Sequence, residues 1–137
     1  MDALRARARP VISLVAEDKG AVVGHIMFSP VLLADHEELT IMGLAPMAVA
    51  RDHQRMGIGS ALVRAGLARC EKAGCDAVVV LGYPNYYPRF GFLPGVRYAI
   101  KSEYNVADDV FMVLELHTAS LQGISGVITY HELFANL

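Results

Sequence analysis

Gln54-Arg55-Met56-Gly57-Ile58-Gly59-Ser60 is the stretch that decides the fold, because it joins an apolar segment to an amphipathic one. Its two glycines let the backbone approach a ligand without an intervening Cβ. From Ile58 to Cys70 apolar residues recur on one face, which predicts a helix over 57–73 that ends at Gly74. The first N–H groups of a helix have no internal partner and lie at the positive end of its dipole. The stretch therefore predicts a cradle for a pyrophosphate at a helix N-terminus.

The spacing excludes two other kinds of phosphate-binding loop. A Walker loop requires Lys followed by Ser or Thr after its second glycine, whereas Ser60 and Ala61 follow Gly59. A dinucleotide-binding fingerprint requires Gly or Ala where Leu62 stands, and an acidic residue about twenty positions further on, where residues 78–81 are apolar. What remains is a Gln-Arg-x-Gly-x-Gly loop between an apolar strand and a helix.

This loop resembles the coenzyme A pyrophosphate loop of the GCN5-related N-acetyltransferase (GNAT) superfamily, including the apolar residues 44–49 that precede it. A second segment, Gly82 to Phe92, is similar to the Tyr-x-x-x-Gly-Phe signature of the same superfamily, with Tyr87 in the tyrosine position. The resemblance runs from about residue 22 to residue 116. The closing segment 126–134 is similar to the C-terminal strand of one bacterial branch of the superfamily.

The hydrophobic pattern predicts strands on both sides of the helix. One of them, over 76–82, is apolar throughout its centre, which is typical of a strand covered on both faces; we expect it to be parallel to the strand before the helix. Asp18-Lys19-Gly20 is expected as the turn of a hairpin, and Pro46 as the site of an irregularity. The other strands are expected over 11–17, 21–28, 39–44, 47–49, 98–101, 110–116 and 127–130. The resemblance implies an α/β (α+β) fold: a mixed, mostly antiparallel twisted sheet with a central splayed parallel pair and few helices.

The composition limits the class of protein. At 137 residues the chain has the usual length of one domain, so 1–137 is predicted to be a single N-acetyltransferase-like domain. A net charge of −2 argues against a nucleic-acid binder, and the longest apolar runs are too short for a membrane span. Without a signal-peptide pattern, a cytoplasmic protein is expected. Cys70 and Cys75 lack a third cysteine or a nearby histidine, so they are predicted to be buried thiols, and no metal site is expected.

The resemblance implies acetyl coenzyme A (acetyl-CoA) as co-substrate. With the pyrophosphate on the N–H groups of 55–60, the pantetheine arm of the donor can lie along strand 47–49, where a backbone N–H polarises the thioester carbonyl. The predicted cofactor-binding residues are Met47, Ala48, Val49, Gln54, Arg55, Met56, Gly57, Ile58, Gly59, Ser60 and Asn85. Gln54 is expected to fix the loop, Arg55 to offer its backbone N–H, and Asn85 either to bind the arm or to form a turn.

Direct attack on the thioester requires a neutral amine, yet an alkyl amine with a pKa of about 10.4 is almost fully protonated at pH 7. No signature singles out the base among Asp35, His36, Glu37, Glu38, Glu103 and Glu115. The leaving thiolate needs a proton or a strong hydrogen bond, and Tyr87 is the predicted acid. Its alternative role is an aromatic wedge packed against the cofactor arm. Tyr86, Phe90 and Phe92 are expected in the core.

The resemblance therefore implies an acetyl-CoA-dependent N-acetyltransferase that acetylates a primary amine of a small molecule or a protein. The alternative is a non-catalytic acyl-CoA sensor. Only ten residues precede Val11, so the opening strand–helix unit of the superfamily is expected to be shortened. In the superfamily those helices help to wall the acceptor side, which makes a homodimer that completes this side a hypothesis.

Overall fold

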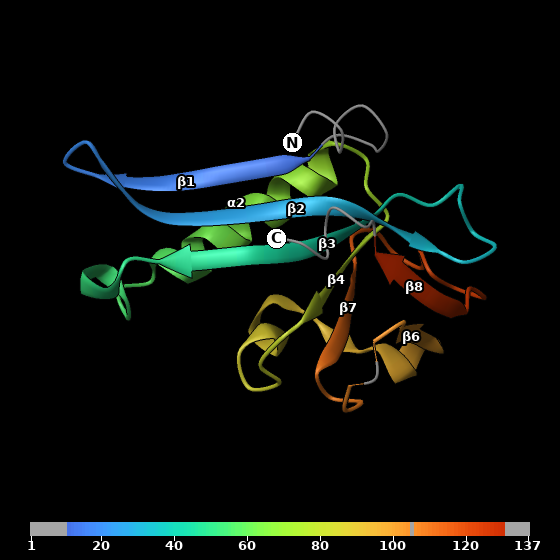
Figure 1. Cartoon of the computed structure of the whole chain (residues 1–137). Coiled ribbons are helices and arrows are strands. Elements are labelled where there is room, and N and C mark those ends of the chain that lie inside the picture. The colour runs from blue at the N-terminus through green and yellow to red at the C-terminus, as the bar shows by residue number, and fades with distance from the viewer. Residues whose placement is uncertain (1–10, 105, 131–137) are drawn as a thin grey trace.

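A strongly bent mixed sheet with one long helix against one of its faces makes up the described part of the chain (Figure 1). The structure is a computed structural model that describes residues 11–104 and 106–130. The strands are β1 (Ile12–Asp18), β2 (Ala21–Leu33), β3 (Ile41–Val49), β4 (Ala77–Leu81), β5 (Leu93–Pro94), β6 (Ile100–Ser102), β7 (Phe111–Glu115) and β8 (Gly126–Tyr130). The helices are α2 (Ile58–Lys72) and the short 3-10 helices η1 (Arg51–His53), η2 (Tyr87–Phe90) and η3 (Gly95–Tyr98). The sheet has the order β5-β7-β4-β3-β2-β8-β6, and β1 pairs with β2.

The predicted hairpin is confirmed as the antiparallel pair β1 and β2. Its turn residues Lys19 and Gly20 have φ angles of 52° and 84°, the left-handed backbone that matches the twist of a tight hairpin. Strand β2 continues to Leu33, beyond the expected end at residue 28. Pro30 is tolerated inside it because β1 ends its pairing at Phe28 and β8 begins at Val31, so neither strand pairs with the proline.

Strand β3 is a single strand through Pro46 rather than the two separate runs expected. The irregularity predicted near Pro46 is present: Ile26 of β2 pairs with Met47 of β3, whereas Phe28 pairs with Leu44. Two residues of β3 thus bulge against one of β2, which bends the strand. The bend lies just before the end of β3 that leads into the Gly-rich loop.

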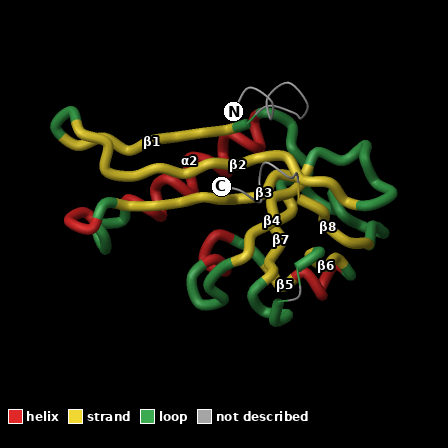
Figure 2. The backbone as a smooth tube through the Cα atoms, viewed as in Figure 1, coloured by secondary structure: helices red, strands yellow, loops and turns green. Residues whose placement is uncertain are grey.

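Strands β3 and β4 are the parallel pair that the sequence predicts. Their pairing begins at Ile41 with Ala77 and ends at Gly43 with Val79. Both strands continue beyond this point, and Figure 2 shows them diverging at their carboxyl ends. In an open α/β sheet this is the end at which ligands bind. The predicted splay of the central pair is therefore present.

Helix α2 packs on the sheet through a close contact at Gly66. A Cβ at this position would lie 2.1 Å from Cε1 of Phe28, so only glycine lets the helix approach the strand this closely. Leu62, Val63 and Cys70 are buried on the same side of the helix. The opposite face of the sheet covers a second cluster that contains Val31, Ile41, Val79, Val113 and Ile128.

Both cysteines are buried thiols that form no disulfide, as predicted. A hydrogen bond to Cys75, with burial as a smaller cause, raises the pKa of the Cys70 thiol, so this thiol is unreactive at neutral pH. In the described part of the chain, no helix has both the length and the apolar character needed to cross a membrane. Two predictions fall outside the described residues. The shortened opening unit depends on residues 1–10, and the end of the C-terminal similarity depends on residues 131–134.

Candidate active site

The N-terminus of α2 is built for an anion. Gly57 caps the helix with a φ angle of 82°, which glycine adopts at little cost. The first intrahelical bond runs from the N–H of Ala61 to the carbonyl of Gly57, so the N–H groups of the three residues 58–60 precede the helical ladder. No side chain of the described residues caps the helix, and its first turn holds no acidic residue. These N–H groups can therefore donate to a ligand.

A hollow of about 350 Å³ lies over this helix end. It is lined by Val49, His53, Gln54, Arg55, Gly57, Gly59, Ser60, Tyr86 and Arg89. The described lining thus contains two arginines and no carboxylate, so its charge favours an anion.

Two hydrogen bonds position the loop that carries the hollow. The side-chain amide of Gln54 donates to the carbonyl oxygen of Val49 over 3.1 Å, which ties the loop to the end of β3. The ring of His53 lies with Nε2 3.0 Å from Oδ2 of Asp18, beside the turn of the β1–β2 hairpin. Arg55 has a φ angle of 66°, so the loop turns sharply just before Gly57. The hairpin and β3 together fix the cradle.

Tyr86 lines this hollow, although the sequence placed it in the core. Its ring is half-buried and lies edge-on to Tyr87 and Phe90 at 5.0 and 5.3 Å between ring centroids. Its hydroxyl is 2.9 Å from the hydroxyl of Ser60 in the first turn of α2. Tyr86 therefore has both roles, packing with one edge of its ring and lining the cradle with its hydroxyl.

Arg89 is a lining residue that the sequence analysis missed. Its guanidinium carbon lies 4.5 Å from the centroid of the Tyr86 ring, and its Nε donates to the Tyr86 carbonyl over 2.9 Å. Residues three apart lie on one side of a 3-10 helix, and η2 begins directly after Tyr86. The Tyr-Tyr-Pro-Arg spacing was the feature of the sequence from which the position of Arg89 beside Tyr86 could have been predicted.

The remaining predicted donor-site residues belong to β3, to the Gly-rich loop with the start of α2, and to the segment after β4. Met47 and Val49 face α2, with side-chain atoms 4.0 and 3.7 Å from the Cβ position of Gly59, whereas Ala48 is exposed. Met56 is 66% exposed, and Ile58 packs against the core. Met47, Ala48, Met56, Ile58 and Asn85 are not among the lining residues of the hollow. The carbonyl oxygen of Asn85 lies 3.5 Å from Nη2 of Arg89.

Tyr87 is buried in the core close to the end of β4. It is only 5% exposed, and its ring covers Gly82 so closely that a Cβ there would lie 2.4 Å from Cε2 of Tyr87. Burial is the main cause that raises the pKa of Tyr87 to about 12, so the phenol keeps its proton at neutral pH. Packing and proton donation are both compatible with this position. Phe92 is fully buried beside it, as expected.

A small cavity marks the point where β3 and β4 separate. Its volume is about 50 Å³, and it is lined by Gly43, Leu44, Ala45, Val79, Val80, Leu81 and Tyr130. The hydroxyl of Ser102 donates to that of Tyr130 over 3.3 Å, and the Tyr130 ring stacks on Tyr104 at 5.0 Å. Burial raises the pKa of Tyr130. This polar side chain therefore borders the gap between the strands.

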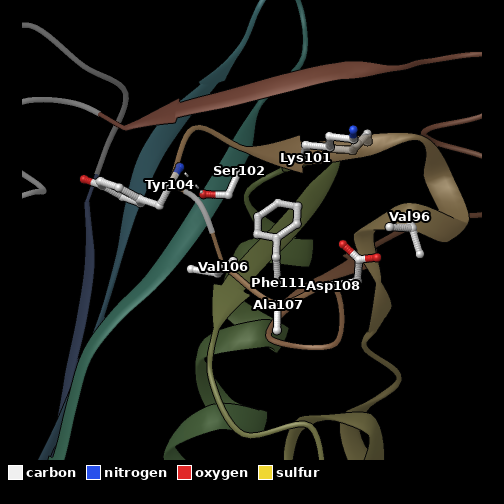
Figure 3. Close-up of a pocket in the computed structure, with 9 residues that line it drawn as sticks. Val96, Lys101, Ser102, Tyr104, Val106, Ala107, Asp108 and Phe111 are labelled. Carbon is white, nitrogen blue, oxygen red and sulfur yellow. Dashed lines mark hydrogen bonds between the residues drawn. The ribbon is translucent and has the colours of Figure 1, made fainter.

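Ser102 and Tyr104 also line a second cavity, of about 110 Å³ (Figure 3). Phe111 and Asp108 belong to its lining, and Phe111 pairs with Leu81 of the first cavity. The two cavities thus lie on either side of the contact between Ser102 and Tyr130.

None of the six candidate bases is among the described lining residues of these two cavities. Two of them accept backbone hydrogen bonds instead: Glu103 Oε2 from the N–H of Tyr130 over 2.5 Å, and Glu115 Oε2 from that of Leu121 over 2.9 Å. Across residues 11–104 and 106–130, no three His, Cys, Asp or Glu side chains form a group that can hold a metal ion.

Comparison with known proteins agrees with this geometry. A family model described as the acetyltransferase (GNAT) family matches residues 1–92. The uncharacterized N-acetyltransferase YhbS of Escherichia coli K12 is 36% identical over 124 residues, which cover 90% of this chain and 74% of YhbS. The uncharacterized N-acetyltransferase YjhQ of the same strain is 43% identical over 88 residues, or 64% of this chain and 49% of YjhQ.

Two solved structures share the fold. E. coli YhbS in complex with CoA matches with a TM-score of 0.87 at 34% identity, over 98% of this chain and 74% of YhbS. A GNAT acetyltransferase from Brucella melitensis in complex with acetyl-CoA matches with a TM-score of 0.74 at 39% identity, over 97% of this chain and 74% of that protein. The bent mixed sheet with its splayed parallel pair is the fold of these enzymes. The chain therefore belongs to the GNAT acetyltransferase family and is an N-acetyltransferase with acetyl-CoA as its co-substrate.

Proposed function

We propose that the protein transfers the acetyl group of acetyl-CoA to a primary amine by direct attack of the amine on the thioester. The observation that carries the proposal is that an anion-binding helix end adjoins the end of β3, whose edge beyond Gly43 has no strand partner among the described residues. Val49, at the end of β3, lies 3.7 Å from the Cβ position of Gly59 in the first turn of α2. A donor with a pyrophosphate in its middle fits such a juxtaposition.

The donor would lie across the two features in a fixed direction. Its pyrophosphate accepts hydrogen bonds from the N–H groups of residues 58–60, with Arg55 adding positive charge. Its pantetheine arm follows β3 over 47–49, on the side where pairing with β4 has ended at Gly43. The thioester then reaches the gap between the strands. The CoA and acetyl-CoA complexes of the two related structures support a donor at this site.

The chemical step forms a C–N bond and breaks the C–S bond. The amine nitrogen attacks the carbonyl carbon and loses its proton to a base or to water, and the thiolate of CoA leaves. A phenol with a pKa of about 12 is more than a thousandfold less acidic than a thiol of about 8.5. We therefore assign Tyr87 a hydrogen bond to the departing thiolate rather than complete proton transfer in the transition state.

Two measurements test this function. Calorimetry should show CoA binding, and thiol release from acetyl-CoA should depend on an added amine in a panel of small amines, amino acids, amine-bearing antibiotics and lysine peptides. Thiol release that no amine accelerates would contradict direct transfer. Binding without release for every amine would favour the acyl-CoA sensor instead.

We also propose a cytoplasmic homodimer. Strand β1 pairs only with β2 within the described residues; Val15 of β1 is 53% exposed and Val22 of β2 is 60% exposed. Apolar side chains beside an unpaired strand edge favour association with a second copy. Light scattering at micromolar concentration that gives only the monomer mass of 14.9 kDa would contradict the dimer.

A further inference from the structure

The pyrophosphate hollow adjoins a second groove at Arg89. This groove has a volume of about 420 Å³ and runs between α2 and the end of β7. It is lined by Arg64, Leu67, Ala68, Glu71, Arg89, Phe90, Leu114, Glu115 and Leu116. Arg89 is the one residue that lines both hollows among the described residues, so any ligand that extends from one into the other passes its guanidinium.

Arg89 is held in place by neutral partners. Its guanidinium lies over the ring of Tyr86, its Nε donates to the Tyr86 carbonyl, and Nη2 lies 3.5 Å from the carbonyl of Asn85. The Tyr86 hydroxyl is in turn bonded to Ser60 at the helix end. Among the described residues, Arg89 forms no ion pair with a carboxylate within 4.0 Å. A guanidinium has five N–H donors, so most of them remain available to an anion.

The direction in which the donor extends from the hollow identifies the anionic group that can reach Arg89. The pantetheine arm leaves the cradle along β3, so the adenosine must leave on another side. On the side of Arg55 the adenosine would meet an exposed loop, whereas on the side of Arg89 it meets the groove. The adenosine of CoA carries a 3′-phosphate on its ribose. That phosphate is the remaining anionic group of the donor once the pyrophosphate occupies the helix end.

We propose that Arg89 binds the 3′-phosphate of CoA and that the groove along α2 holds the adenosine. This inference rests on the proposed function for the direction of the donor. Arg64, whose guanidinium carbon lies 5.1 Å from the centroid of the Phe90 ring, adds a second positive charge to the groove. Glu71 and Glu115 also line the groove and repel a phosphate placed near them. The 3′-phosphate is therefore placed at the end of the groove where Arg89 lies. Arg89 makes the site bind CoA more tightly than its 3′-dephospho form.

Calorimetry with CoA and 3′-dephospho-CoA tests the assignment. The wild-type protein should bind CoA about tenfold more tightly than dephospho-CoA, as expected for charge-assisted hydrogen bonds to one phosphate. Arg89→Ala should weaken CoA binding by about the same factor and leave dephospho-CoA binding unchanged, so that the preference disappears. Arg89→Lys should keep part of the preference, because it keeps the charge without the planar fork.

Two controls separate this role from the neighbouring ones. Arg55→Ala should weaken both ligands equally, because it acts on the shared pyrophosphate. Arg69→Ala, in the exposed last turn of α2, should change neither. Equal weakening of both ligands by Arg89→Ala, or no weakening, would overturn the assignment. A wild-type protein that binds neither ligand would contradict the proposed function itself.

Discussion

The hydroxyl of Tyr86 lies 2.9 Å from the hydroxyl of Ser60, and this contact joins the two sequence motifs into one site. Ser60 ends the Gly-rich loop, and Tyr86 belongs to the aromatic segment that follows β4. Because β4 is parallel to β3, the chain returns to the same edge of the sheet before Tyr86. The parallel pairing is thus what brings the second motif to the helix end that the first motif begins.

Tyr86→Phe should loosen this junction. The variant loses one hydrogen bond, so we expect the free energy of unfolding to fall by about 1 kcal/mol. CoA affinity should fall several-fold, because the hydroxyl that is lost also bonds Ser60 where both residues line the pyrophosphate hollow. Urea denaturation and calorimetry measure the two effects. Tyr83→Phe is the matched control, since Tyr83 is 75% exposed and should affect neither quantity. Unchanged CoA affinity in Tyr86→Phe would show that the junction is only structural.

Gly57 can be tested with two side chains of equal size. Apart from its two chain neighbours, no described residue has an atom within 4 Å of a Cβ at Gly57, but the φ angle of 82° strains any other residue. Gly57→Gln and Gly57→Glu should therefore lose stability equally, by about 1 kcal/mol. Only the glutamate adds a negative charge beside the expected pyrophosphate. CoA affinity should fall at least about tenfold further in Gly57→Glu than in Gly57→Gln. Equal affinities would contradict the cradle.

Most of the scaffold could be predicted because local patterns decide it. The helical period predicted 57–73, and α2 is Ile58–Lys72 with Gly57 as its cap. Uninterrupted apolar residues correctly indicated that β4 is central and parallel to β3. The predicted end of β2 at residue 28 was wrong, because Ser29-Pro30 has the sequence of a strand break. What permits Pro30 is the gap between the β1 and β8 pairings, which a local pattern does not contain.

The site was predicted less completely than the scaffold. The glycines of the loop predict the helix N-terminus, because the backbone conformation that requires them is local in the sequence. No comparable local pattern predicts Arg89, because its position depends on the 3-10 turn that places it over Tyr86. Tyr130 was harder still to predict, since it reaches the gap between β3 and β4 through the pairing of β8 with β2. Such contacts between distant segments follow from the tertiary structure.

The buried phenol of Tyr87 should make the fold sensitive to alkali. Its folded pKa of about 12 lies above the ordinary value of about 10, so the unfolded chain loses the proton first as the pH rises. This contribution to stability is complete below pH 10 and is lost between about pH 10 and 12, on the order of 2 kcal/mol. Urea denaturation at pH 8, 10 and 11 measures it. Tyr87→Phe should be less sensitive, and an unchanged pH dependence in that variant would contradict the assignment.

Tyr87→Phe also separates the two roles of the residue in catalysis. If the hydroxyl hydrogen-bonds the departing thiolate, kcat should fall about tenfold or more while the CoA dissociation constant stays within about twofold. If the ring only packs, both values should stay near those of the wild type. Steady-state kinetics of thiol release and calorimetry give the two numbers. The wild-type rate should not decline through loss of this proton between pH 8 and 10, because the pKa of Tyr87 is raised to about 12.

Tyr130 provides the test of the acceptor side. Its ring lines the cavity between β3 and β4, and its hydroxyl accepts a hydrogen bond from Ser102. If the amine approaches the thioester through this gap, Tyr130→Phe should raise the KM for the amine several-fold and leave CoA affinity unchanged. Ser102→Ala should produce a smaller change in the same direction, since it removes only the partner of the hydroxyl. A change in CoA affinity with a constant amine KM would instead place Tyr130 against the donor, and the acceptor would then have to enter from the other face of the sheet.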